Sequence, residues 1–279
     1  MKPACLKNRP VLFLDSGIGG IPYCRHFYRR NPGESIVYLA DRLNFPYGPR
    51  ERMELTAILT ELVKKAIKAL NPKIAVLACN TATIAALREL REEFPELPFV
   101  GTVPAVKPAV LASKTGKIGL LGTELTVKEP YIRQIALQYG NCEIIGIAAP
   151  ELVEFTENRL DSASEEEKKA TTKNYLSRFR EAGVDAIVLG CTHFLFLLEN
   201  FQQEAAPDIT VFESIEGISH RIESLLAETI PKEQEKNQAN GTAPCNLNHL
   251  LLTGRAAPEK SWINWAERLG FNLSLFEEI

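Results

Sequence analysis

Short apolar runs alternate along the chain with longer stretches in which apolar and polar residues are mixed. The runs are rich in Val, Ile and Leu and have the length of buried strands; they cover 11–14, 35–39, 74–78, 99–101, 117–121, 143–147, 186–190 and 210–213. The mixed stretches between them have the length of helices. This alternation predicts βα units and an α/β fold with a mostly parallel sheet flanked by helices.

The segment 51–70 has the clearest helical periodicity. Its apolar residues recur at intervals of three and four, which places them on one face of a helix; they are Leu55, Ile58, Leu59, Leu62, Val63, Ala66, Ile67 and Leu70. Asn71 and Pro72 follow directly, and both residue types are common just past the end of a helix. We therefore expect this helix to end at residue 70.

An internal repeat gives the strongest signal of domain organisation. The sequence KIAVLACNTATIAALREL at 73–90 resembles VDAIVLGCTHFLFLLENF at 184–201, and VLFLDSGIGG at 11–20 resembles KIGLLGTELT at 117–126. Cys79 and Cys191 occupy matching places in the first pair. We expect two related α/β domains, one made of 1–99 plus 210–279 and the other of 100–209, with a cleft between them.

Charge and composition exclude several classes of protein. The chain has 279 residues, 32 Lys and Arg against 35 Asp and Glu, and a net charge of −3, so it offers no basic face for nucleic acid and no polybasic tract for a membrane. The first apolar run, 11–14, is too short for a signal peptide or a membrane span. These features predict a cytoplasmic protein with no nucleic-acid or membrane partner.

Two segments near the C-terminus complete the expected layout. The stretch 231–248 is polar and rich in Asn, Gln and Lys, which predicts an exposed loop. After it, the apolar run 250–253 and the helical spacing of Trp262, Trp265 and Leu269 predict elements that pack back onto a sheet.

The six cysteines form no CxxC pair and are spread along the chain, which argues against a disulfide framework. Free cysteines are mostly small buried side chains. Cys79 and Cys191 differ from the others because the repeat puts both at the carboxyl end of a strand. In parallel sheets ligands collect beyond these ends, so the two thiols are expected to face each other across one cleft.

Other polar residues follow the strands at the same edge. The strand ends carry Asp15-Ser16-Gly17, Cys79-Asn80-Thr81, Gly122-Thr123 and Cys191-Thr192-His193. Two facing thiols suit proton transfer at a carbon atom, since one can act as base while the other acts as acid. A thiol needs help to ionise near neutral pH, and the start of a helix, His193 and Asp15 can each provide it.

Two other kinds of site fit the residues less well. The glycine-rich DSGIGG at 15–20 lacks the spacing of a dinucleotide fingerprint, and no Walker lysine follows it; its amides at Ser16 and Gly17 can equally hold a carboxylate. Cys191 and His193 have no second ligand pair at metal-binding spacing. We therefore expect neither a cofactor nor a metal.

The motifs together resemble those of cofactor-independent glutamate racemases in the aspartate/glutamate racemase superfamily. The matching segments are DSGIGG (15–20), ADRLNFPYG (40–48), ACNTAT (78–83), GTVPAVKPA (101–109), LLGTELTVKEPY (120–131) and GCTH (190–193). This resemblance implies interconversion of L- and D-glutamate without a cofactor, to supply D-glutamate for peptidoglycan. It also implies two pseudosymmetric domains with the active site between them. The expected partner is glutamate, and a homodimer is a candidate assembly.

Site residues carry over from the family position by position. The resemblance implies that Cys79 and Cys191 are the paired acid–base thiols, each serving one stereochemical direction, and that Asp15 and His193 assist them. The residues that it implies for substrate binding, besides Asp15 and His193, are Ser16, Tyr47, Gly48, Asn80, Thr81 and Thr192. Thr123 and Glu151 match positions that are often near the site.

Departures from the family pattern keep alternatives open. Ala40 replaces a usual Gly, Phe194-Leu195 replaces an aromatic-Pro pair, and Glu213-Ser214 replaces Asp-Ser. None of these changes touches the thiols, but side-chain selectivity is open to aspartate or another acidic amino acid. A non-catalytic amino-acid-binding relative and a thiol redox protein are the alternatives from other classes.

Overall fold

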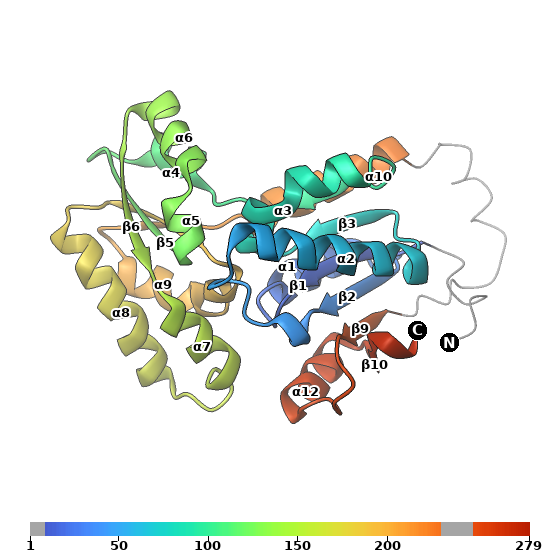
Figure 1. The fold of residues 1–279 in the computed structure, drawn as a ribbon. Helices are drawn as coiled ribbons and strands as arrows, with labels where there is room; N and C mark the ends of the chain where they lie inside the picture. Colours follow the sequence, from blue (N-terminus) through green and yellow to red (C-terminus); the bar gives the residue numbers. More distant parts are fainter. Residues whose placement is uncertain (1–8, 230–247) are drawn as a thin grey trace.

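The computed structural model describes residues 9–229 and 248–279. It contains two parallel sheets that lie side by side, each flanked by helices (Figure 1). The expected α/β fold is therefore confirmed. Below, the six-stranded sheet with its helices is the first half, and the four-stranded sheet with its helices is the second half.

The first half has the strand order β10-β9-β2-β1-β3-β4. Its strands are β1 (Val11–Asp15), β2 (Ile36–Ala40), β3 (Ile74–Leu77), β4 (Phe99–Gly101), β9 (His249–Leu252) and β10 (Asn272–Leu275). Its helices are α1 (Ile21–Arg30), α2 (Arg52–Leu70), α3 (Asn80–Glu93), α10 (Ile215–Thr229) and α12 (Lys260–Leu269), with 3₁₀ turns η2 (Arg42–Asn44) and η5 (Phe276–Glu278). Apolar side chains of α2 and α3 pack on one face of the sheet, and those of α1, α10 and α12 pack on the other.

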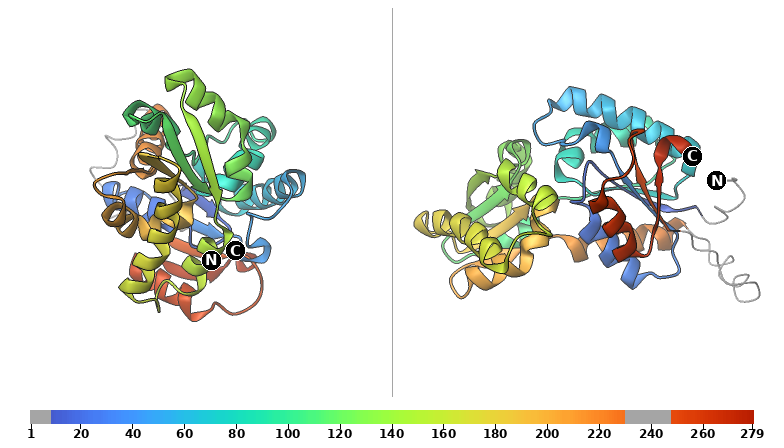
Figure 2. Two further views of the ribbon diagram at one scale, coloured as in Figure 1. Left: turned by 90° about the vertical axis from the view of Figure 1, so that its left-hand side faces the viewer. Right: turned by 90° about the horizontal axis from the view of Figure 1, so that it is seen from below.

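The second half has the strand order β6-β5-β7-β8. Its strands are β5 (Lys117–Gly122), β6 (Glu143–Ala148), β7 (Ala186–Gly190) and β8 (Thr210–Phe212). Its helices are α4 (Val106–Ala112), α5 (Glu124–Lys128), α6 (Pro130–Gly140), α7 (Pro150–Asn158), α8 (Glu165–Glu181), the 3₁₀ helix η3 (Thr192–Leu197) and α9 (Leu198–Ala205). Helices α4 and α6 cover one face, and α7, α8 and α9 cover the other (Figure 2).

The repeat seen in the sequence appears as matching topology. The order β2-β1-β3-β4 in the first half corresponds to β6-β5-β7-β8 in the second, with every pairing parallel. Strands β9 and β10 extend the first sheet beyond the repeat. The sequence patterns predicted the matching strands to within a residue or two at each end.

The chain passes between the two sheets after β4 and again after β8. The range 1–99 ends inside β4, which pairs with β3 in the first sheet. The range 210–279 begins with β8, which pairs with β7 in the second sheet. We propose that the chain leaves the first domain after Gly101 and returns after Phe212, as the sheet pairings indicate.

Helices α2 and α12 both agree with predictions made from the sequence. Helix α2 ends as predicted at Leu70, where Asn71 adopts a left-handed conformation (φ 45°) and its amide hydrogen-bonds to the Ile67 carbonyl. The C-terminal segment packs back onto the first sheet as predicted, and Trp262 and Trp265 on α12 are buried.

Two further predictions concern the polar stretch near the C-terminus and membrane-spanning helices. The polar stretch 231–248 lies outside the described residues except for Asn248, which is buried and accepts a hydrogen bond from the Ile36 amide at 2.9 Å. No helix within 9–229 and 248–279 combines the length and the apolar character needed to cross a bilayer.

Candidate active site

A cavity of about 360 Å³ lies at the carboxyl ends of the strands, between the two halves. The first half lines it with Ser16, Phe45, Pro46, Tyr47, Gly48, Pro49, Cys79 and Thr81, and the second half with Thr123, Glu124, Pro150, Val153, Cys191 and His193. Both repeated cysteines are thus at one cavity. None of its lining residues is Lys or Arg, so hydrogen-bond donors and His193 are the groups available to an anion.

The remaining predicted site residues lie outside this lining. Asp15 is fully buried at the end of β1, behind the cavity wall, and accepts a hydrogen bond from the Thr192 hydroxyl at 3.4 Å. Asn80 donates to the Thr102 carbonyl at 3.4 Å. Glu151 points to the outer side of α7, where it accepts a hydrogen bond from Tyr175 at 2.6 Å. The structure therefore brings Asp15, Asn80 and Thr192 to the site but not Glu151.

Each cysteine occupies the N-cap position of a helix, one or two residues after the end of a buried strand. Cys79 precedes α3 and Cys191 precedes η3, and both thiols are free and buried. Burial raises the pKa of Cys79, and the negative charge of Asp15 raises it further, whereas hydrogen bonds from the amides of Ala82 and Thr81 lower it. The side chain of Cys79 is therefore a protonated thiol rather than a thiolate before the reaction.

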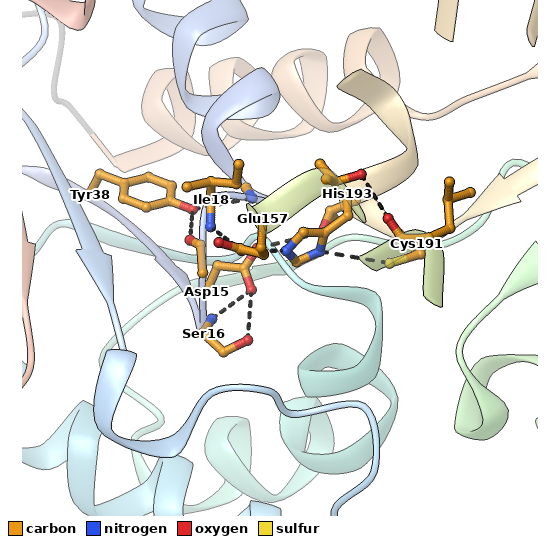
Figure 3. Close-up of polar contacts among 12 residues, drawn as sticks. Asp15, Ser16, Ile18, Tyr38, Glu157, Cys191 and His193 are labelled. Atoms are coloured by element: carbon orange, nitrogen blue, oxygen red, sulfur yellow. Dashed lines mark hydrogen bonds and ion pairs between the residues drawn. The ribbon is translucent and has the colours of Figure 1, made fainter. Parts of the chain in front are cut away.

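Cys191 has a different neighbour. Its sulfur lies 3.8 Å from Nδ1 of His193, whose Nε2 lies 2.7 Å from the Glu157 carboxylate (Figure 3). Burial lowers the pKa of His193, but its hydrogen bonds to Cys191 and Glu157 outweigh this effect and raise the pKa well above its usual value. The raised pKa favours the cationic form of the imidazole, which lies beside the Cys191 sulfur.

Glu157 is a functional residue that the sequence reasoning missed. The same oxygen that contacts His193 also accepts a hydrogen bond from the Ile18 amide at 2.7 Å, so Glu157 joins the second half to the loop after β1. One signal could have found it: Glu157 lies four residues after Val153, which lines the cavity, and residues at this spacing share a face of a helix. Glu151 lies on another face.

Hydroxyl groups also connect the two halves across the cavity. Thr81 and Thr123 lie 3.0 Å apart between their Oγ1 atoms, and Thr123 contacts Thr126 at 3.1 Å. Thr81 and Thr123 both line the cavity. A bound ligand can therefore exchange hydrogen bonds with hydroxyls from both halves.

The glycines of DSGIGG serve close packing around the site. A Cβ atom at Gly17 would lie 1.9 Å from Oε1 of Glu157, and one at Gly20 would lie 2.6 Å from Cβ of Ala78. A Cβ atom at Gly19 would lie 2.5 Å from Nδ1 of His193. These glycines let the loop approach the residues that hold the imidazole, which accounts for them without a phosphate ligand.

The variant Gly19→Ala is expected to lower kcat by roughly tenfold or more, because the new methyl group displaces His193 and small displacements of catalytic groups are costly. Gly33→Ala is the matched control, since a Cβ there meets nothing within 4 Å. Steady-state assays of both purified variants test this. Full activity of Gly19→Ala would show that the position of His193 is unimportant.

Burial raises the pKa of Asp15 to about 6, although the nearby His193 cation lowers it. The folded protein thus holds this proton to higher pH than the unfolded chain does. The stabilising contribution of Asp15 is present below about pH 4, the usual pKa of an aspartate, and is lost as the pH rises through about 6.

The variant Asp15→Asn is expected to lack this pH dependence. Between about pH 4 and pH 7.5, the free energy of unfolding of the variant relative to the wild type should rise by on the order of 3 kcal/mol, as a shift of this size implies. Urea unfolding at both pH values measures the difference. A difference that stays constant with pH would contradict the raised pKa.

Within 9–229 and 248–279, no group of three or more His, Cys, Asp or Glu side chains is arranged to hold a metal ion. The chemistry that the cavity does present is a pair of thiols contributed by different halves. A carbon acid bound between them can lose a proton to one thiol and gain one from the other.

Comparison with known proteins gives consistent relatives. A family model described as Asp/Glu/Hydantoin racemase matches residues 30–218. The chain is 38% identical over 222 residues to a glutamate racemase of Roseiflexus sp. strain RS-1, covering 79% of this chain and 80% of that protein. It is 37% identical over 234 residues to a glutamate racemase of Treponema pallidum, covering 84% of each.

Solved structures agree over nearly the whole chain. The crystal structure of Escherichia coli glutamate racemase in complex with L-glutamate and the activator UDP-MurNAc-Ala has a TM-score of 0.81 at 28% identity, covering 96% of this chain and 97% of that one. A glutamate racemase isoform from Bacillus anthracis has a TM-score of 0.75 at 29% identity with the same coverage. The two-sheet fold is thus the fold of these racemases.

Proposed function

Because the chain belongs to the Asp/Glu/hydantoin racemase family, we propose that it is a glutamate racemase, which interconverts L- and D-glutamate by proton transfer at the α-carbon. The observation that carries this proposal is that two buried thiols, Cys79 and Cys191, reach one cavity from different halves of the molecule. The similarity to a racemase whose structure was determined with L-glutamate supports the choice of substrate.

In this mechanism the two cysteines exchange roles with the direction of reaction. The thiolate of one cysteine takes the α-proton, which leaves the electron pair on the α-carbon, and the thiol of the other donates its proton to the opposite face. The product is the other enantiomer, and the two sulfurs have exchanged protonation states. The reverse reaction then begins from the state that the forward reaction leaves.

Neighbouring groups prepare the two sulfurs differently. The His193 imidazole, whose pKa is raised, lies beside the Cys191 sulfur and is held there by Glu157. At Cys79 the amides at the start of α3 stabilise negative charge, and Asp15 opposes it. We propose that Cys79 carries its proton before substrate binds.

Neutral donors hold the substrate's carboxylates in this proposal. Ser16, Thr81 and the amide of Gly48 are placed at the cavity, together with the helix start at Cys79. Asn80 and Thr192 support this wall from behind rather than from the cavity itself. The apolar groups of Phe45, Pro46 and Val153 restrict the entry of water to the reacting carbon.

Three finer expectations belong to the same proposal. The expected product use is supply of D-glutamate for peptidoglycan, the expected location is the cytoplasm, and the expected assembly is a homodimer. All three stay predictions. The aspartate alternative also stays open on mechanism alone, because the proton-transfer groups do not depend on the length of the substrate side chain.

An optical assay tests the function directly. L-Glutamate, D-glutamate, L-aspartate and D-aspartate are incubated separately with the protein and no added cofactor, and the optical rotation is followed. We expect both glutamate enantiomers to approach zero rotation and aspartate to change far more slowly. The double variant Cys79→Ser/Cys191→Ser controls for contaminating enzyme. Unchanged rotation of glutamate would refute the proposal, and faster racemisation of aspartate would change the substrate.

A further inference from the structure

The loop that contributes residues 45–49 to the cavity is held from behind by a network of polar side chains. Its centre is Asp41, a residue that is 1% exposed. The Tyr47 hydroxyl donates to this carboxylate at 2.7 Å, the Asn44 side-chain amide at 2.9 Å and the Thr253 hydroxyl at 2.8 Å. Thr253 is 212 positions further along the chain, just after β9.

Thr253 contacts four consecutive residues where β2 leads into this loop. Its amide donates to the Ala40 carbonyl at 3.0 Å, and its hydroxyl donates to Asp41 while accepting from the Leu43 amide at 3.0 Å. Its carbonyl accepts from Nε of Arg42 at 3.2 Å. Thr253 is itself buried, so it binds the start of the loop without reaching the cavity.

The hydrogen bonds to Asp41 come from uncharged donors. Without the Thr253 hydroxyl, Asp41 Oδ1 keeps only the longer hydrogen bond from the Asn44 side-chain amide, at 3.1 Å, and the Leu43 amide loses its acceptor. A part-buried amide left without an acceptor costs more than the lost bond itself contributes. The remaining donors to the carboxylate, Tyr47 and Asn44, both lie on the loop, so a shift of Asp41 moves the loop with it. Because Tyr47 and Gly48 line the cavity, such a movement changes its shape.

We propose that Thr253 is a positioning residue of the substrate cavity, which acts through Asp41 to fix Tyr47 and Gly48. The inference rests on the proposed function only in taking this cavity as the glutamate site. It assigns a role in substrate binding to a residue that lies outside the matched motifs and outside the cavity lining.

The test compares two variants of Thr253 with a matched control. Thr253→Val keeps the shape of the side chain but removes the hydroxyl, whereas Thr253→Ser keeps the hydroxyl. Thr172→Val is the control, because the Thr172 hydroxyl is equally buried but bonds only within α8, away from the cavity. KM and kcat are measured in both directions, together with the melting temperature of each variant.

We expect Thr253→Val to raise KM for both enantiomers by roughly three- to tenfold, the range that loss of one buried hydrogen bond gives, while kcat changes less than KM. Thr253→Ser should restore KM, and Thr172→Val should leave it unchanged. An unchanged KM in Thr253→Val would overturn the proposal, whatever its melting temperature. If the valine variant does not fold, Thr253→Ala carries the same comparison.

A binding measurement separates this inference from the proposed function. Calorimetric titration of D-glutamate into the Cys79→Ser/Cys191→Ser background, with and without Thr253→Val, reports binding without racemisation. We expect weaker binding with Thr253→Val. Tyr47→Phe removes the hydrogen bond from the loop to the Asp41 carboxylate. The loss of binding free energy in the variant that combines Tyr47→Phe with Thr253→Val should be less than the sum of the two separate losses. Equal binding or strict additivity would contradict the positioning role, whereas an inactive wild type would contradict only the function.

Discussion

Replacing either Cys79 or Cys191 with serine is expected to abolish racemisation in both directions. Each direction needs one sulfur as base and the other as acid, so the loss of either blocks the forward and the reverse reaction. A positioned acid or base contributes roughly 10²- to 10⁴-fold to a rate, and a serine hydroxyl is a far weaker acid than a thiol. Cys142→Ser is the matched control, because Cys142 is buried in the second half but does not line the cavity.

Proton exchange separates the roles of the two sulfurs. In deuterated water, a variant that keeps one functional thiol can still remove the α-proton of the enantiomer that presents it to that thiol, and can return a deuteron to the same face. We therefore expect each single variant to exchange the α-proton of one enantiomer without inverting it, and the two variants to prefer opposite enantiomers. Full racemisation by both variants would refute the two-thiol mechanism.

Glu157→Gln is expected to lower kcat by roughly 10- to 100-fold, part of what a positioned acid–base group contributes. The glutamine side chain retains a hydrogen-bonding oxygen for the Ile18 amide but lacks the charge that favours the His193 cation. The pKa of His193 should fall as a result. Because the proposed mechanism uses the His193 cation, the loss of activity at high pH should begin at a lower pH in the variant.

The same substitution at other positions of α7 provides the comparison. Glu154 is exposed on this helix, and Glu151 bonds Tyr175 on its outer side, so Glu154→Gln and Glu151→Gln should change neither kcat nor the pH profile appreciably. A pH profile of Glu157→Gln that matches the wild type would contradict the assigned role of Glu157. A large loss of kcat in Glu151→Gln would instead favour a role for Glu151, the residue that the family resemblance implies.

The positions of the two thiols could be predicted because the signals for them are local. Buried strands are apolar on both faces, so they stand out as short apolar runs, and the residue that ends each run must lie at the carboxyl edge of its sheet. The repeat then places Cys79 and Cys191 at equivalent edges. Chemistry at these positions follows from residue type, which is visible without a structure.

Contacts between distant elements could not be predicted in the same way. Periodicity defines which face of α7 is buried but not that Glu157 meets the Ile18 amide and His193, since that depends on how the two halves pack. The link from Thr253 to Asp41 likewise depends on β9 lying beside β2. Strand β10 was missed because it is a short edge strand of alternating polar and apolar residues.

The central claim is that two different groups, on opposite faces of one carbon, remove and return the proton. L-Glutamate converted in deuterated water without added cofactor tests this most directly, with the isotope content of both enantiomers measured by mass spectrometry at early conversion. The two-thiol mechanism predicts deuterium at the α-carbon of the D-glutamate product and protium in the remaining L-glutamate. Deuterium accumulating in the remaining substrate as fast as in the product would contradict it.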